Sequence, residues 1–221
     1  MPFPRSASTS DDETLMSTNG DKPKGEGAGW KLRGSKTRFE NEIFRVREDD
    51  VELKGGKQVP YAYCERGDAV VIVPITRNGE MVLLKQYRYA IDEWCLETPA
   101  GGMHDTGDAS PEEVAGKELR EEVGATFEKL TYIDSFFSAP ALSDEHCHVF
   151  LAEGVELSKK PQTEASETLE TQLVPVTEAL ELARRGKMKS APCALAVLLC
   201  ESHLQRRSTR GQRTPNESLE T

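Results

Sequence analysis

One segment of the chain carries both a start and a stop signal for a helix, and strand-like segments lie on either side of it. Ser110, Pro111 and Glu113 have the form of a capping box with proline at the first helical position, which predicts that a helix begins at residue 111. Gly124 can take a positive φ at low cost, which predicts an end after residue 123. Strands before and after a helix in one layered domain indicate the α/β or α+β class.

The strand-like segments have either apolar alternation or a short continuous apolar run. Gly55-Gly56 and Asn78-Gly79 are turn signals between consecutive strands and indicate antiparallel hairpins. Two further helices are expected, one that begins after Thr177 and runs to about Arg185, closed by Gly186, and the other over 191–204. The expected strands are 43–46, 51–53, 59–64, 69–75, 81–87, 94–97, 130–137 and 146–152.

The two ends of the chain differ from the middle in composition. Residues 1–34 are rich in Ser, Thr, Gly, Asp and Lys and lack an apolar period, so a disordered arm is expected there. Residues 205–221 hold several arginines among Ser, Thr and Gly and predict a disordered basic tail. Between them we expect an antiparallel β segment over 35–66, of a kind used in dimerisation, and a main domain over 67–204.

Charge and cysteine usage exclude several functional classes. A formal net charge of −10 argues against a protein that binds nucleic acid through the phosphate backbone. Five scattered cysteines, with no Cys-x-x-Cys pair, match neither a disulfide framework nor a structural zinc site. No apolar run is long enough to cross a bilayer, and the N-terminus does not resemble an export signal, so the cytoplasm is the default expectation.

The predicted helix places three carboxylates on one side. Glu118, Glu121 and Glu122 occupy positions i, i+3 and i+4, within an arc of about 100°. Like charges so placed repel one another unless a hard cation neutralises them, and Mg²⁺ prefers such oxygen ligands. An acidic helix face alone is usually just solvated, but here a Pro/Gly loop over 97–102 precedes it. A strand, a glycine loop and an acidic helix together predict a metal site.

These residues resemble the Nudix hydrolases, whose box reads G-x5-E-x7-R-E-U-x-E-E-x-G-U, with U a bulky apolar residue. The match runs from Gly101 to Ala125. Its second half is in register, with Lys117 where the family usually has Arg. Its first half departs from the pattern: the spacing from Gly101 to Lys117 is two residues longer, and Asp108 best represents the usual Glu. The insertion is expected in the loop before the helix.

Two further segments narrow the resemblance to one branch of the family. The sequences KQYR at 85–88 and LETPAG at 96–101 are similar to signatures of the ADP-ribose and nucleoside diphosphate-sugar hydrolases. The segment APALSDE at 139–145 is similar to a loop of the same branch. The resemblance implies a mixed-sheet α/β/α sandwich and hydrolysis of ADP-ribose or an ADP-, UDP- or GDP-sugar with Mg²⁺, or Mn²⁺, as cofactor.

The resemblance also implies roles for particular residues. Glu118, Glu121 and Glu122 would ligate Mg²⁺, with the Ala100 carbonyl as a further ligand. Glu145 would orient or deprotonate the attacking water, with Asp144 as the alternative base. For the substrate, Arg88 would contact the diphosphate, unless it forms a surface ion pair, and Glu97 would lie in the same subsite.

Aromatic side chains of the N-terminal segment are a separate group. Tyr61 and Tyr63 would stack on the substrate base, because the resemblance implies that this segment reaches across a homodimer; packing of a hairpin is an equal alternative. Trp30 has a weaker claim to the same role. His146 and His148 are expected to serve as packing or loop contacts, since a zinc site would need more ligands nearby. Cys147 is expected to be a small buried residue rather than a nucleophile.

Two other functions stay open on the sequence. One is hydrolysis of a different diphosphate, such as a dinucleoside polyphosphate or an RNA cap, although no basic groove is evident. The other is a ligand-sensing or RNA-associated module that kept the fold and lost the chemistry. The three glutamates in register count against the second alternative, whereas the lengthened box and Lys117 favour it.

Overall fold

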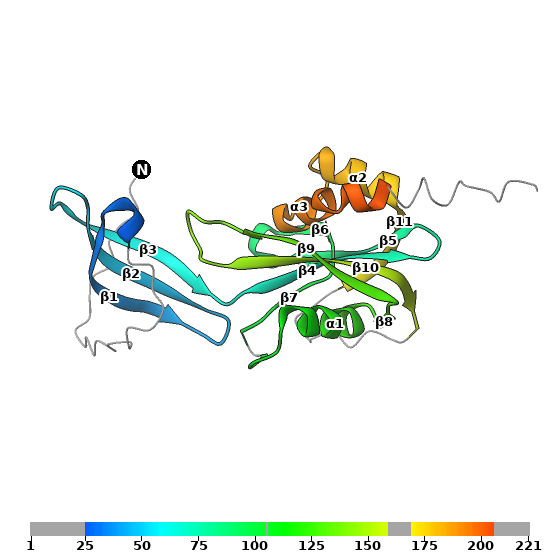
Figure 1. Ribbon diagram of the computed structural model, residues 1–221, viewed down its shortest axis with the longest axis horizontal. Coiled ribbons are helices and arrows are strands. Elements are labelled where there is room, and N and C mark those ends of the chain that lie inside the picture. The colour runs from blue at the N-terminus through cyan, green and yellow to red at the C-terminus, as the bar shows by residue number, and fades with distance from the viewer. Residues whose placement is uncertain (1–24, 105, 159–168, 206–221) are drawn as a thin grey trace, which may run out of the picture. The chain divides into compact units, whose positions relative to one another are not determined.

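The computed structural model describes residues 25–104, 106–158 and 169–205 and divides into two compact units, 1–65 and 66–221 (Figure 1). Most of the predicted N-terminal arm and nearly all of the predicted C-terminal tail lie outside the described residues. No helix among the described residues is both long enough and apolar enough to cross a bilayer.

The first unit is a three-stranded sheet in the order β1-β2-β3, preceded by the short 3-10 helix η1 (Glu26–Ala28). Strands β1 (Lys31–Glu40) and β2 (Phe44–Glu52) pair antiparallel, and β3 (Gln58–Arg66) follows the turn at Gly55 and Gly56. Both glycines have positive φ, 106° and 85°, as the turn signal predicted. The Arg47 side chain is buried in this unit, 3.6 Å from Glu65 and 4.0 Å from Asp49.

Two sequence expectations for this unit are corrected. The segments expected as separate strands at 43–46 and 51–53 belong to the single strand β2. Strand β1 starts at Lys31, inside the segment expected to be an arm. Its mostly polar sequence has no apolar alternation to reveal it; pairing with β2 and surface ion pairs such as Arg33–Glu52 hold it instead.

The second unit is built on an eight-stranded mixed sheet with the backbone order β11-β5-β4-β10-β8. Strands β6, β7 and β9 pair with β5, β4 and β10 respectively. The central pair β4/β10 is parallel, and the other pairs of described strands in this sheet are antiparallel. The strand bounds are β4 (Ala69–Thr76), β5 (Glu80–Arg88), β6 (Glu93–Glu97), β7 (Ala100–Gly102), β8 (Ala125–Thr126), β9 (Lys129–Phe137), β10 (His146–Leu157) and β11 (Leu169–Pro175).

Helices cover both faces of this sheet (Figure 1). Along β4, Val71 and Val73 join one buried cluster with α2 (Val176–Arg184) and α3 (Ala191–Leu199). The alternate residues Val70 and Ile72 join a second cluster with α1 (Pro111–Glu122). A strand buried on both faces explains the continuous apolar run of β4. The expected α/β/α sandwich is confirmed.

Helix α1 follows the sequence signals closely. Ser110 accepts a hydrogen bond from the Glu113 backbone amide, and the Glu113 carboxylate accepts one from the Ser110 amide, so the capping box is complete. This bonding lowers the pKa of Glu113. Gly124 has φ 63° after the helix. Beside the carboxylates, an apolar stripe of Ala115, Leu119 and Val123 is buried.

Candidate active site

The acidic side of α1 faces the short strand β7, which the sequence identified only as a Pro/Gly loop. Strand β7 pairs antiparallel with β4 through Ala100 and Gly101, opposite Val71 and Val70. The Ala100 amide donates a hydrogen bond of 3.0 Å to the Glu122 carboxylate, which is 7% exposed. A buried carboxylate held by a backbone donor has a fixed position. Glu122 therefore joins the helix to the strand that precedes it.

Glu118 lies against the same strand. A Cβ atom added at Gly101 would overlap the Glu118 carboxylate and would lie 2.6 Å from its Cγ. Only glycine therefore leaves room for Glu118 in its observed position, which gives the first glycine of the box a steric function. Gly101 has no positive φ, so close approach rather than backbone conformation explains the residue.

The third carboxylate of α1 is more accessible. The Glu121 side chain is 42% exposed and pairs with Lys117 at 3.6 Å, at i,i+4 spacing. Among the described residues, the α1 carboxylates do not bring three oxygen atoms within 4.8 Å of one another. Carboxylate oxygens, together with water and substrate phosphates, are the ligands that Mg²⁺ prefers in proteins. The donors present, carboxylate oxygens beside a backbone strand, thus match this ion in chemistry.

Arg88 and Glu97 form a second polar group, on the neighbouring strands β5 and β6. The guanidinium donates from Nε and Nη2 to the two Glu97 oxygens at 3.0 and 2.5 Å. Glu97 is 3% exposed, whereas the Arg88 side chain is 48% exposed. The hydrogen bonds that Arg88 donates to Glu97 raise the pKa of Arg88. Glu97 therefore orients Arg88, and the exposed part of Arg88 is accessible to an anion.

The loop that carries Glu145 is closed at its base and anchored to Arg66. The Ser138 amide donates to the Glu145 carbonyl at 3.1 Å, and the Glu145 amide donates to Ser143 Oγ at 3.1 Å. Arg66 Nη1 lies 3.2 Å from the Glu145 carboxylate, and the Arg66 amide donates to Asp144 at 2.8 Å. Both alternative bases are thus held by one residue that sequence reasoning missed. No local pattern around Arg66 marks it, because its partners lie 78 and 79 positions later.

The aromatic residues predicted to stack on a base belong to the other unit. Tyr61 and Tyr63 are 6.4 Å apart between ring centroids, and Trp30 is 6.5 Å from Tyr61. Tyr61 is 40% exposed, but Tyr63 is buried at 7%. Tyr61 is therefore the more accessible of the two, and Tyr63 packs within the unit.

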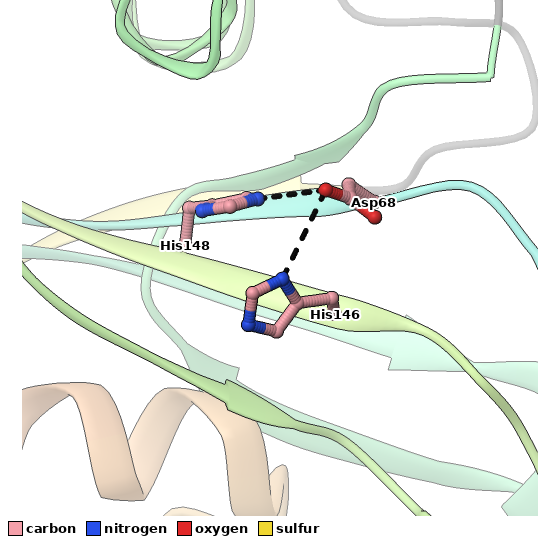
Figure 2. A group of neighbouring side chains, drawn as sticks. All are labelled: Asp68, His146 and His148. Carbon is pink, nitrogen blue, oxygen red and sulfur yellow. Dashed lines mark hydrogen bonds and ion pairs between the residues drawn. The ribbon is translucent and has the colours of Figure 1, made fainter. Parts of the chain in front are cut away.

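A cluster of two histidines and an aspartate lies where β4 and β10 begin (Figure 2). Asp68 precedes β4, and His146 and His148 begin β10. Asp68 Oδ2 lies 2.8 Å from His148 Nε2 and 4.0 Å from His146 Nδ1. Sequence reasoning missed Asp68, because this residue lies just before β4, almost eighty positions earlier in the chain than the histidines.

Cys147, between the two histidines, points to the opposite face of the sheet. It is 2% exposed and belongs to the cluster packed by α2 and α3. Burial raises its pKa to about 12. A buried thiol that stays protonated is not a nucleophile at neutral pH, in agreement with the expectation from the sequence.

Comparison with known proteins identifies two domains in the chain. The NUDIX domain matches residues 65–195, more than half of the chain, and the nucleoside diphosphate sugar hydrolase N-terminal domain matches residues 30–63. The ADP-ribose pyrophosphatase of Bacillus subtilis is 33% identical over 160 residues, which cover 72% of this chain and 85% of that protein.

One further relative and one solved structure are also similar to the chain. The CMP-5'-(N-acetyl-N-hydroxy-3-aminopropyl)phosphonate hydrolase of Streptomyces rubellomurinus is 29% identical over 76% of this chain and 81% of its own length. A crystal structure of an ADP compounds hydrolase superposes with a TM-score of 0.70 at 23% identity and covers 80% of this chain and 95% of that one. This last likeness shows the fold. The chain therefore belongs to the Nudix family and is a hydrolase that acts on pyrophosphate bonds.

Proposed function

We propose that the protein hydrolyses the diphosphate of ADP-ribose or a closely related nucleoside diphosphate-sugar, with Mg²⁺ as cofactor, to a nucleoside monophosphate and a sugar phosphate. The observation that carries this proposal is the anchoring of Glu118 and Glu122 against β7, which gives the acidic side of α1 a fixed geometry. A solvated acidic helix face would need neither a buried carboxylate nor a glycine at position 101 to make room for Glu118.

The choice of substrate class rests on both domains together. The N-terminal segment matches a domain described from nucleoside diphosphate sugar hydrolases, and a relative of one-third identity is named ADP-ribose pyrophosphatase. The alternatives, a dinucleoside polyphosphate or an RNA cap, have no comparable support. A module without catalytic activity is disfavoured because all three α1 carboxylates are present.

In the proposed reaction, different residues would have different chemical roles. Glu118, Glu121 and Glu122 would hold Mg²⁺, with the Ala100 carbonyl as a further ligand. The ion, when bound, would neutralise the diphosphate oxygens and make a water more acidic. Glu145 or Asp144 would accept the proton of the attacking water. Water would add to one phosphorus while the bridging oxygen leaves with the other, so that both products carry a monophosphate.

Arg88 and Glu97 would form the diphosphate subsite. Arginine's planar fork matches phosphate oxygens, and Arg88 already has its orientation fixed by two hydrogen bonds to Glu97. A pre-oriented side chain loses less entropy when the substrate binds. Glu97 would act through Arg88 rather than on the substrate.

We propose that the base is stacked by Tyr61 in a homodimer, with Tyr63 and Trp30 supporting it in a row of aromatic rings. Tyr61→Ala is expected to raise KM for ADP-ribose by roughly tenfold, the equivalent of one base stacked on an aromatic ring, with kcat little changed. Phe39→Ala is the matched control, because Phe39 is also an exposed aromatic residue of this unit. Equal KM values in the two variants would remove Tyr61 from the binding site.

The direct test is a substrate panel. ADP-ribose, ADP-glucose, UDP-glucose, GDP-mannose and a diadenosine polyphosphate are each incubated with the protein and Mg²⁺ or Mn²⁺, and a phosphatase releases phosphate from the monophosphate products. We expect release from ADP-ribose or from an ADP- or other nucleoside diphosphate-sugar. Release from the polyphosphate alone, or from no compound, would overturn the proposal. Size-exclusion chromatography with light scattering tests the dimer separately.

A further inference from the structure

The cluster of Asp68, His146 and His148 has the composition of a transition-metal site rather than a magnesium site. Two imidazole nitrogens and one carboxylate oxygen, all within 4.8 Å of one another, converge from two parallel strands (Figure 2). Imidazole ligands favour Zn²⁺ and its neighbours, whereas Mg²⁺ favours oxygen ligands. The cluster therefore differs in chemistry from the carboxylates of α1.

The backbone explains why these three side chains meet. His146 and His148 are two residues apart on β10, so both point to the same face of the sheet. Strand β10 pairs in parallel with β4 in the register Cys147↔Ala69. Asp68 therefore lies directly beside His146 across the strand pair, and the register places a carboxylate between two imidazoles.

The distances are close to those that a zinc ion would need. Ligands about 2.0–2.1 Å from a tetrahedral zinc are roughly 3.3 Å from one another. The separations of Asp68 Oδ2 from His148 Nε2 and His146 Nδ1, 2.8 and 4.0 Å, lie on either side of that value. Side-chain rotations that move the ligand atoms by less than about 1 Å would bring both distances to that value, without a change in the backbone.

Neighbouring aromatic rings hold the imidazoles in this orientation. His146 stacks on Phe137 with ring centroids 4.9 Å apart, and His148 lies 6.3 Å from Tyr132. Ligands whose orientation is set by their surroundings lose little entropy when an ion binds. Both histidines are also partly exposed, so an ion can reach them from solvent.

We propose that Asp68, His146 and His148 form a Zn²⁺-class site separate from the Mg²⁺ carboxylates, with the ion joining the starts of β4 and β10. Three protein ligands leave a position for water or an external anion. The Asp68 carbonyl also accepts a hydrogen bond of 2.8 Å from the Met103 amide. The site is thereby connected to the segment directly after the β7 glycines.

Equilibrium dialysis of the full-length protein against Zn²⁺ in excess Mg²⁺ tests the site without any assay of activity. Excess Mg²⁺ keeps the carboxylate site from contributing. The wild type is expected to bind one equivalent of Zn²⁺, and Asp68→Asn, His146→Gln and His148→Gln are each expected to weaken binding at least tenfold. Asp68 is exposed and His146 is half-buried, so their variants should remain folded, which circular dichroism verifies.

Two control variants address other zinc ligands. His203→Gln removes an exposed histidine that follows α3 in the chain, and Cys64→Ser removes the least buried thiol among the described cysteines. Both should bind Zn²⁺ like the wild type. A stoichiometry of zero in the wild type, equal binding in the three ligand variants, or loss of binding in Cys64→Ser would each overturn the proposal.

A spectroscopic measurement on the wild type removes any dependence on variants. The chain has four histidines, so their ring nitrogen signals can be resolved individually by NMR. Zn²⁺ is expected to shift the ring signals of His146 Nδ1 and His148 Nε2 and to leave those of His203 unchanged. Uniform shifts of all four histidines would indicate non-specific binding and refute the site.

Discussion

Substitution of Gly101 by alanine tests how closely the fold and the proposed chemistry depend on each other. The new Cβ would lie 2.6 Å from Glu118 Cγ, whereas two non-bonded carbon atoms need about 3.5–4.0 Å. Glu118 must therefore move by about 1 Å. A displacement of this size at a catalytic group costs roughly a hundredfold in rate, or about 2.7 kcal/mol in the activation barrier.

The neighbouring glycine provides a matched control. A Cβ at Gly102 would also be tight, 2.8 Å from His104 Nδ1, but His104 is exposed and its ring can swing away. Gly101→Ala is expected to lose about a hundredfold in kcat/KM for ADP-ribose, and Gly102→Ala less than about threefold. Thermal unfolding should show both variants folded, because neither glycine has a positive φ.

The assay is steady-state kinetics of both variants beside the wild type, at the Mg²⁺ concentration that saturates the wild type and at higher concentrations. Equal activity of Gly101→Ala and Gly102→Ala would refute the reasoning, because the contact with Glu118 would then have no catalytic consequence. A loss in Gly101→Ala that higher Mg²⁺ partly restores would support displacement of a metal ligand in particular.

Three other predictions concern stability and reactivity. Arg88→Met leaves the buried Glu97 carboxylate without its partner and should lower the free energy of unfolding by about 2–3 kcal/mol, as measured by urea denaturation. The loss should be smaller than for a fully buried pair, because the Arg88 side chain is half exposed. In a double-mutant cycle, adding Glu97→Gln should recover most of the lost stability. Leu119→Ala opens a cavity at a fully buried position of α1 and should lower the free energy of unfolding by about 2–5 kcal/mol in the same measurement. A loss below about 1 kcal/mol would mean that α1 does not pack as described. Cys147, with its pKa raised to about 12, should resist iodoacetamide at pH 8 in the folded protein and react once urea unfolds it, as mass spectrometry of the peptide would show.

Local signals in the sequence were sufficient for the parts of the fold that depend on neighbouring residues. The helix start at Ser110 and its stop at Gly124 depend on hydrogen bonds and a φ value within a few residues, and both are present. The direction in which the carboxylates of α1 point follows from helix geometry alone. These features could be predicted because their causes are close together in the chain.

Features that depend on pairing between distant segments could not be predicted. Strand β11 acquires its structure from β5, with which it shares seven paired positions, and its own pattern is weak. Arg66 and Asp68 contact the loop and strand around 144–148. No residue beside either one in the sequence indicates these contacts. The histidines at 146 and 148 were expected to be packing residues because their third partner comes from a strand that only the tertiary structure brings alongside.

The central claim, that the carboxylates of α1 carry metal-dependent hydrolysis, is tested most directly by Glu121→Gln. Glu121 is partly exposed and its contact with Lys117 is an exposed pair, so this substitution should leave thermal stability near that of the wild type. With ADP-ribose and Mg²⁺, the wild type is expected to form AMP and ribose phosphate, and Glu121→Gln to be slower by about a hundredfold or more. A folded Glu121→Gln protein with full activity would contradict the claim.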